Sequence, residues 1–317
     1  MTRTARVTSA AVAAATAGAL LLSIAPGAQA ADNPTRNERA ARTVEAATGT
    51  SDLARATDAP GAAAAARTQQ GDATVTAQAP TDSAGTIRLT APDGTRAGLG
   101  LPQAPGRRAV EGARAGAGTV VYRDASESTD VAVQLTSDGG ARAIATLKDS
   151  NAPAEQRYEL SLPEGTEAVA DGSGGYDLIR PVEGGAAVAV GRIDAPWAKD
   201  AQGSPVATGY RLEGNTLVQR VDTTEGTAFP VVADPKVTWG IVTGTIYFNR
   251  GETRSIALGG GLGATAVAAI PGGITTVVGV TMAAITARAA AAYDRGRCLK
   301  IKLPHVYPDH YAGGYCQ

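Results

Sequence analysis

Short runs of alternating or apolar residues between about Ser83 and Pro235 limit the possible folds of this chain more than any other feature. Each run is only a few residues long, and Gly, Pro, Asp or Asn separates it from the next. Runs of this kind, divided by turn residues, are typical of antiparallel strands. The predicted strands are Thr86–Thr90, Thr119–Tyr122, Val131–Leu135, Ala141–Leu147, Arg157–Leu162, Tyr176–Ile179, Ala186–Ile193, Thr216–Val221 and Phe229–Val232.

No long helical pattern separates these strands, which argues against an α/β fold. We therefore predict a mainly β domain over residues 83–235, either a sandwich or a curled antiparallel sheet. Aromatic residues make up only 4% of the chain, so its core is expected to consist of Val, Leu, Ile and Ala. The sequence Asp234-Pro235 predicts an extended exit and the end of this domain.

Part of this region resembles a known pattern. The chain reads A-P-W-A-K-D-A-Q-G at 195–203 and F-P-V-V-A-D-P at 229–235, with R-Y-E-L-S-L-P at 157–163 before them. These segments are similar to a block in uncharacterised secreted proteins of actinobacteria, especially the Streptomyces group. The resemblance covers residues 119–235, and it implies export and a stalk-like β module. It implies no enzymatic activity.

The first 30 residues are predicted to be a signal peptide. Arg3 and Arg6 precede an Ala/Leu-rich stretch that ends at Ile24, and Ala28-Gln29-Ala30 fits the small-x-small pattern at a cleavage site. Export therefore follows, with Ala31 as the first residue of the secreted, extracellular protein. The alternative is an uncleaved N-terminal membrane anchor.

Residues 31–82 are predicted to be a disordered tether. The stretch is rich in Ala, Thr, Arg and Asp, lacks aromatic residues up to Ala79, and has Val44, Leu53 and Val75 as its branched apolar residues there. A segment of this composition buries too little surface to offset the entropy lost on ordering. The alanine run 62–66 favours a transient helix at most.

The charge of the chain is unevenly distributed. Residues 31–235 hold 19 basic and 27 acidic side chains, whereas residues 236–317 hold 8 basic and 3 acidic ones. The C-terminal segment is therefore cationic, with a net charge of +5, beside a region of net charge −8. Three explanations stay open: attraction between the two parts, an anionic partner for the basic end, and solvated surfaces whose charge differs by chance.

The C-terminal segment, residues 236–317, is predicted to form a small β-α-α-β unit. A strand over 237–248 is followed by Asn249, which fits the N-cap of a helix with Glu252 as its reciprocal partner. That helix is expected to reach about Ala269, before Pro271 ends it. A second helix over 274–295, with Gly296 as its C-terminal cap, precedes a strand over 298–303.

No charged residue occurs between Arg254 and Arg288, so these two helices are uncharged along most of their length. Each apolar stretch is shorter than the ~20 residues that a membrane-spanning helix needs. The first hypothesis is a helical hairpin buried against itself, in which case the disulfide-bonded protein does not bind lipid. The alternatives are a two-pass insertion and a shallow or conditional one.

The chain has two cysteines, Cys298 and Cys316. An even number of cysteines in an exported chain predicts one disulfide. A metal site would require His305 and His310 as further ligands, and the local spacing of a zinc site is absent. We therefore predict a disulfide, and neither a metal nor another cofactor.

Acid–base chemistry based on histidine would have to use His305, Asp309 and His310, with Ser204 or Ser255 as the nucleophile. No G-x-S-x-G motif is present, so we predict that the protein is not an enzyme. The first functional hypothesis is a secreted spacer that presents a cationic interaction module to an anionic cell envelope or membrane surface, without nucleic-acid binding. The alternatives are a membrane-active effector carried by an acidic pro-region, and a secreted hydrolase. The predicted contact residues are Arg250, Arg254, Arg295, Arg297, Lys300, Lys302, Tyr307, Tyr311 and Tyr315.

Overall fold

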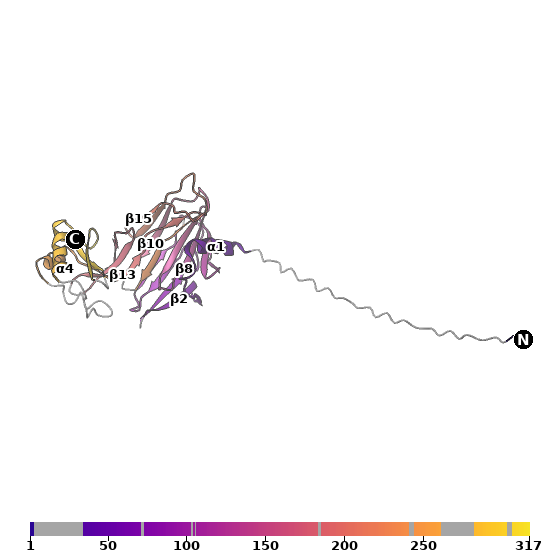
Figure 1. Ribbon diagram of the computed structural model, residues 1–317, viewed down its shortest axis with the longest axis horizontal. Coiled ribbons are helices and arrows are strands. Elements are labelled where there is room, and N and C mark those ends of the chain that lie inside the picture. The colour runs from indigo at the N-terminus through magenta and orange to yellow at the C-terminus, as the bar shows by residue number, and fades with distance from the viewer. Residues whose placement is uncertain are drawn as a thin grey trace. The chain divides into compact units, whose positions relative to one another are not determined.

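Two antiparallel sheets make up most of the described chain, and they pack against each other as a sandwich (Figure 1). The structure is a computed structural model that describes residues 1–2, 34–70, 73–102, 104, 106–182, 185–240, 244–260, 282–302 and 306–317. The chain divides into a unit before Pro34 and a unit from Pro34 to Gln317. The second unit contains both sheets, which confirms the predicted mainly β class.

The first sheet has eight strands in the order β1-β2-β3-β4-β5-β10-β16-β15. Strand β10 connects its two halves, because it pairs with β5 on one side and β16 on the other. The strands are β1 (Thr57–Ala59), β2 (Ala62–Gln70), β3 (Ala73–Ala79), β4 (Thr86–Thr90), β5 (Arg96–Gly100), β10 (Glu155–Ser161), β15 (Thr208–Glu213) and β16 (Thr216–Val221).

The second sheet has thirteen strands, nine of them along the path β21-β20-β19-β13-β18-β9-β8-β7-β6. The other four, β11, β12, β14 and β17, lie off this path. The strands are β6 (Ala113–Ala115), β7 (Thr119–Ser126), β8 (Thr129–Leu135), β9 (Ala141–Leu147), β11 (Glu167–Ala170), β12 (Tyr176–Pro181), β13 (Ala187–Ile193), β14 (Ala198–Lys199), β17 (Val231–Ala233), β18 (Lys236–Trp239), β19 (Thr245–Tyr247), β20 (Cys298–Lys302) and β21 (Tyr307–Tyr311).

The main core lies between the two sheets. Alternate residues of each strand point into it, as strand β10 illustrates, where Tyr158 and Leu160 are buried while Arg157 and Glu159 are exposed. Most core side chains are Ala, Val, Leu and Ile, as the composition predicts. The predicted strands over 86–90, 141–147 and 216–221 coincide with β4, β9 and β16, and the other six overlap strands of the structure.

The prediction of a disordered tether is wrong for residues 34–82. Helix α1 (Arg36–Thr48) begins at a capping box formed by Thr35 and Glu38. It buries Ala41 and Val44 against the outer face of the second sheet. Strands β1 to β3 then join the first sheet, and the alanine run expected to be helical forms part of β2 instead. Sheet pairing outweighs the helix propensity of alanine here.

The predicted domain boundary at Pro235 is also not found. Strands β17 and β18 stand on either side of it, and both pair with β9 in the same sheet. The strand expected over 237–248 forms two strands, β18 and β19. The first ends before Gly240, whose φ of +77° places the backbone in the left-handed region, which breaks an extended strand.

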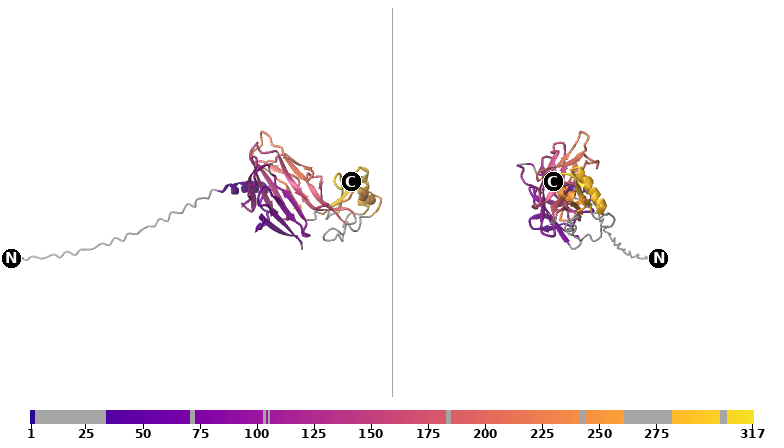
Figure 2. Two further views of the ribbon diagram at one scale, coloured as in Figure 1. Left: turned by 180° about the vertical axis from the view of Figure 1, so that it is seen from behind. Right: turned by 90° about the vertical axis from the view of Figure 1, so that its left-hand side faces the viewer.

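The C-terminal end of the second unit consists of β19, helix α2 (Arg250–Ala257), helix α4 (Met282–Asp294), β20 and β21. Figure 2 shows α4 in two further views. The predicted cap at Asn249, the positive φ of Gly296 and the strand after it are confirmed. Helix α2 ends at Ala257, well before the predicted Ala269, and β21 was not predicted. The middle of the uncharged segment, 261–281, lies outside the described residues, and no described helix is long and apolar enough to cross a membrane.

Candidate interaction site in the C-terminal module

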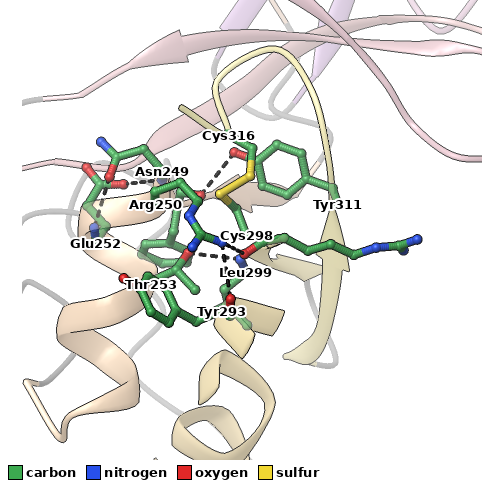
Figure 3. Close-up of a disulfide and its surroundings, with 11 residues drawn as sticks. Asn249, Arg250, Glu252, Thr253, Tyr293, Cys298, Leu299, Tyr311 and Cys316 are labelled. Atoms are coloured by element: carbon green, nitrogen blue, oxygen red, sulfur yellow. Dashed lines mark hydrogen bonds between the residues drawn. A yellow bond between two sulfur atoms is a disulfide. The ribbon is translucent and has the colours of Figure 1, made fainter. Parts of the chain in front are cut away.

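The disulfide predicted between Cys298 and Cys316 is present, with an S–S distance of 2.07 Å and a Cα–Cα distance of 5.5 Å (Figure 3). Cys298 begins β20, and Cys316 is the penultimate residue of the chain, so the bond closes a loop around the β20–β21 hairpin. Cys298 is fully buried beside Tyr247 and Tyr311. The bond therefore fixes the end of the chain to the last strands of the second sheet. We refer to residues 245–317 as the C-terminal module.

Glu252 connects three parts of this module. One carboxylate oxygen accepts the Asn249 N–H at 2.7 Å, which completes the capping box of α2. The other accepts the Ala186 N–H at 2.6 Å and the Tyr315 hydroxyl at 3.3 Å. The sequence predicts only the capping contact. The same side chain also joins the helix to the start of β13 and to the disulfide-bonded tail.

Arg250 was predicted as a surface contact, but its guanidinium is used within the module. It donates hydrogen bonds to the carbonyls of Tyr293 at 3.2 Å and Arg297 at 3.3 Å. It also stacks on the Tyr293 ring, 4.2 Å from the centroid. Its backbone N–H donates to the Gln317 carbonyl at 3.1 Å. Arg250 thus holds the start of α2 against the end of α4 and the chain terminus (Figure 3).

Lys300 and Tyr311 are buried, at 4% and 5% exposure, so the prediction that they contact a partner is wrong. The Lys300 ammonium donates to the Asp171 carbonyl at 2.9 Å, and burial lowers its pKa. The Tyr311 hydroxyl donates to the Phe248 carbonyl at 3.0 Å, and its ring meets Tyr247 edge to face at 4.8 Å. Lys300 therefore fixes the module to the loop before β12, and Tyr311 packs against β19 within the module.

Four of the predicted cationic residues remain exposed: Arg254, Arg295, Arg297 and Lys302. A further cation, Arg288 on α4, is only partly exposed and was not predicted. Its guanidinium lies 3.8 Å from the Asp309 carboxylate, whose other oxygen lies 3.7 Å from the Lys302 ammonium. Both distances are those of ion pairs, and neither is short enough for a hydrogen bond, so Arg288 and Lys302 share a single carboxylate.

His310 follows Asp309 on β21. Partial burial lowers the pKa of His310, and the positive charge of Arg297 acts in the same direction. Burial alone would raise the pKa of Asp309, but the His310 N–H and the nearby lysines hold it below its usual value. The pair therefore carries a neutral imidazole and an ionised carboxylate at neutral pH. The cations around it outnumber this single carboxylate.

Among the described residues, neither predicted serine nucleophile is placed against the predicted acid–base residues Asp309 and His310. His305 lies outside the described residues. Ser204 is in the turn after β14, where its N–H donates to the Asp200 carboxylate, and Ser255 is exposed on α2. Neither serine forms a hydrogen bond with His310 in the part of the chain that the structure describes, and no group of potential metal ligands occurs there either.

Sequence reasoning missed one buried acidic group, in the sandwich. In the sequence, Asp234 was interpreted only as part of a domain end. Its side chain is 1% exposed, and burial raises its pKa to about 7. Its carboxylate accepts the Trp197 N–H at 3.3 Å, and its carbonyl accepts the Tyr210 hydroxyl at 2.8 Å. In the other sheet, Tyr158 and Gln219 each have one buried oxygen without a hydrogen-bond partner among the described residues. No pattern of neighbouring residues indicated that this carboxylate is buried.

Comparison of the chain with protein-family models, with curated proteins and with solved structures finds no match. The resemblance to secreted actinobacterial proteins therefore stays a prediction. The site can be interpreted only from its own residues.

Proposed function

We propose that this chain is an exported, non-enzymatic protein that presents a disulfide-closed cationic module to an anionic partner. The sandwich carries the module, and the module makes the contact. The signal-peptide pattern of the first 30 residues supports export. The disulfide supports it as well, because such bonds persist mainly in oxidising compartments.

The observation that carries the proposal is that some basic side chains of the module form internal hydrogen bonds, whereas others are exposed to solvent. Arg250 holds the two helices of the module together, and Lys300 holds the module to the loop that contains Asp171. Arg295, Arg297 and Lys302 are exposed, and Arg254 is exposed on α2. Lys302 shares the Asp309 carboxylate with Arg288, so the group as a whole keeps a net positive charge, which an anionic surface attracts over about one Debye length.

Salt elution from phosphocellulose tests this proposal. The purified protein should be retained at low ionic strength and released as salt rises. A variant with Arg295→Gln, Arg297→Gln and Lys302→Gln should elute at clearly lower salt. The matched control, Arg67→Gln, Arg88→Gln and Arg96→Gln, removes three exposed arginines from the sandwich instead. Equal elution of the two variants would contradict a contact made by the module.

A further inference from the structure

Large exposed apolar side chains are concentrated in the C-terminal module. Within residues 34–317, those described as exposed are Leu258 at 78%, Tyr307 at 57% and Met282 at 46%. All three belong to this module, although it is the smaller part of the unit. The described part of the sandwich exposes no large apolar side chain to this extent. Exposed apolar residues confined to one part of a protein indicate a contact surface.

The arrangement of the helices places Leu258 and Met282 at the same end of the module. Arg250, at the start of α2, donates to carbonyls at and beyond the end of α4. At the other ends, Ile256 of α2 and Ile285 of α4 belong to one core cluster, so the two helices are antiparallel. Leu258 follows α2, roughly 12 Å along the axis from Arg250. Met282 begins α4, roughly 17 Å before Tyr293. Leu258 and Met282 therefore lie at the same end of the helix pair, opposite the end where Arg250 contacts α4.

Tyr307 lies toward this end too. Strand β20 begins just after the turn that ends α4, and its Leu299 N–H donates to the Thr253 hydroxyl near the start of α2. The strand then runs back alongside α4 to Lys302, which pairs with Tyr307 at the start of β21. We call Leu258, Met282 and Tyr307 the apolar end of the module.

Cations border the apolar end. Arg254 lies four residues before Leu258, on the same side of α2. Lys302 is opposite Tyr307 in the β20–β21 pair. Arg288 contacts the same hairpin, because its guanidinium lies 3.8 Å from the Asp309 carboxylate on β21. Apolar side chains beside Lys and Arg are the combination that binds the interface of an anionic bilayer, where the apolar groups enter the headgroup region and the cations meet the lipid phosphates.

We propose that the apolar end docks on the surface of an anionic phospholipid bilayer, with Leu258, Met282 and Tyr307 entering the headgroup region. This inference rests on the proposed function and specifies its partner. It replaces the expectation from the sequence that the disulfide-bonded protein does not bind lipid. An anionic polymer would satisfy the cations but would give the exposed apolar side chains nothing to contact. A bilayer satisfies both, so the charge and the apolar surface together favour lipid.

Flotation with vesicles tests this inference on the oxidised chain, residues 31–317. The protein should float with vesicles of phosphatidylglycerol and phosphatidylcholine and remain behind with vesicles of phosphatidylcholine alone. A variant with Leu258→Ser, Met282→Ser and Tyr307→Ser should bind the anionic vesicles less tightly by about tenfold or more. It should elute from phosphocellulose as the wild type does, and its urea midpoint should match that of the wild type, which shows that it is folded.

A second variant separates charge from apolar contact. Arg254→Gln with Lys302→Gln should weaken vesicle binding by roughly thirtyfold at low salt and also lower the salt needed for elution. The control with Arg88→Gln and Arg96→Gln should bind vesicles as the wild type does. If the serine variant floats as well as the wild type, the docking inference is wrong.

The two proposals fail in different ways. If the wild type is retained on phosphocellulose but floats with neither kind of vesicle, its partner is a polymeric anion. In that case the proposed function stands, and the inference of lipid docking is wrong. A protein that is neither retained nor floated contradicts both. Release of a dye trapped inside the anionic vesicles would replace surface docking by a membrane-permeabilising activity.

Discussion

Replacing Asp234 by asparagine should stabilise the protein at neutral and alkaline pH. This carboxyl is 1% exposed in the sandwich, and burial raises its pKa to about 7. The Trp197 N–H, which donates to it at 3.3 Å, acts in the opposite direction but does not outweigh burial. Asparagine has nearly the same shape, keeps an oxygen that accepts this bond, and cannot ionise. The substitution therefore removes the cost of a buried charge and little else.

The size and sign of the effect follow from the pKa. A pKa raised from 3.8 to about 7 corresponds to about 4 kcal/mol, which is the upper limit of the gain. The unfolded chain releases the Asp234 proton near pH 3.8, whereas the folded protein keeps it until about pH 7. The contribution of the neutral carboxyl is therefore complete below the lower pKa and is lost as pH rises through the folded pKa.

Urea unfolding of the wild type and Asp234→Asn, from about pH 4 to about pH 8, measures this effect. The free energies of unfolding should agree near pH 4, and the variant should gain steadily up to about pH 7. Asp58→Asn is the control, because its side chain is 89% exposed and a surface ion pair of this kind contributes little. A difference between Asp234→Asn and wild type that does not change with pH would refute the reasoning.

Three further predictions concern the ends of the chain and the module. Intact-mass analysis of the extracellular protein should give a chain that begins at Ala31 and lacks two hydrogens, and a thiol reagent that adds mass without prior reduction would contradict this. The variant Cys316→Ser should lose about 3 kcal/mol of unfolding free energy, because the disulfide closes a loop with a sequence separation of 18 residues; an unchanged urea midpoint would show that the bond does not hold the module. Arg250→Ala should lower the free energy of unfolding by about 1–3 kcal/mol, because two carbonyls lose their donor. Arg254→Ala, on the exposed face of the same helix, should leave the free energy of unfolding nearly unchanged. Equal losses in the two variants would contradict the separate roles assigned to these arginines.

Local sequence signals predicted the local structures well. Asn249 and Glu252 form the expected capping box because each residue satisfies a backbone N–H of the other within one turn. Gly296 has the expected positive φ after α4 because the turn there requires it. The disulfide followed from the presence of two cysteines in a chain with an export signal.

Features that depend on distant contacts were not predictable in this way. Residues 62–79 form two strands because β4 provides a partner and because small side chains such as Ala64 and Ala77 fit the core of the sandwich. Composition alone suggested too little apolar area for order. Alternation along β20 placed Lys300 and Lys302 on one face, but the loop containing Asp171 covers only the first of them. A strand pattern does not reveal which part of a face another loop will bury.

Hydrogen exchange of the oxidised protein, with and without anionic vesicles, tests the central claim most directly. If the module makes the contact, amides around 254–258, 282–288 and 302–311 should exchange more slowly on vesicles, while the strands of the sandwich should be unchanged. These ranges contain the exposed cations Arg254 and Lys302 and the partly exposed Arg288, together with the apolar end. Slower exchange confined to the first sheet, for example at β4 and β5, would contradict the account and move the interaction site to the sandwich.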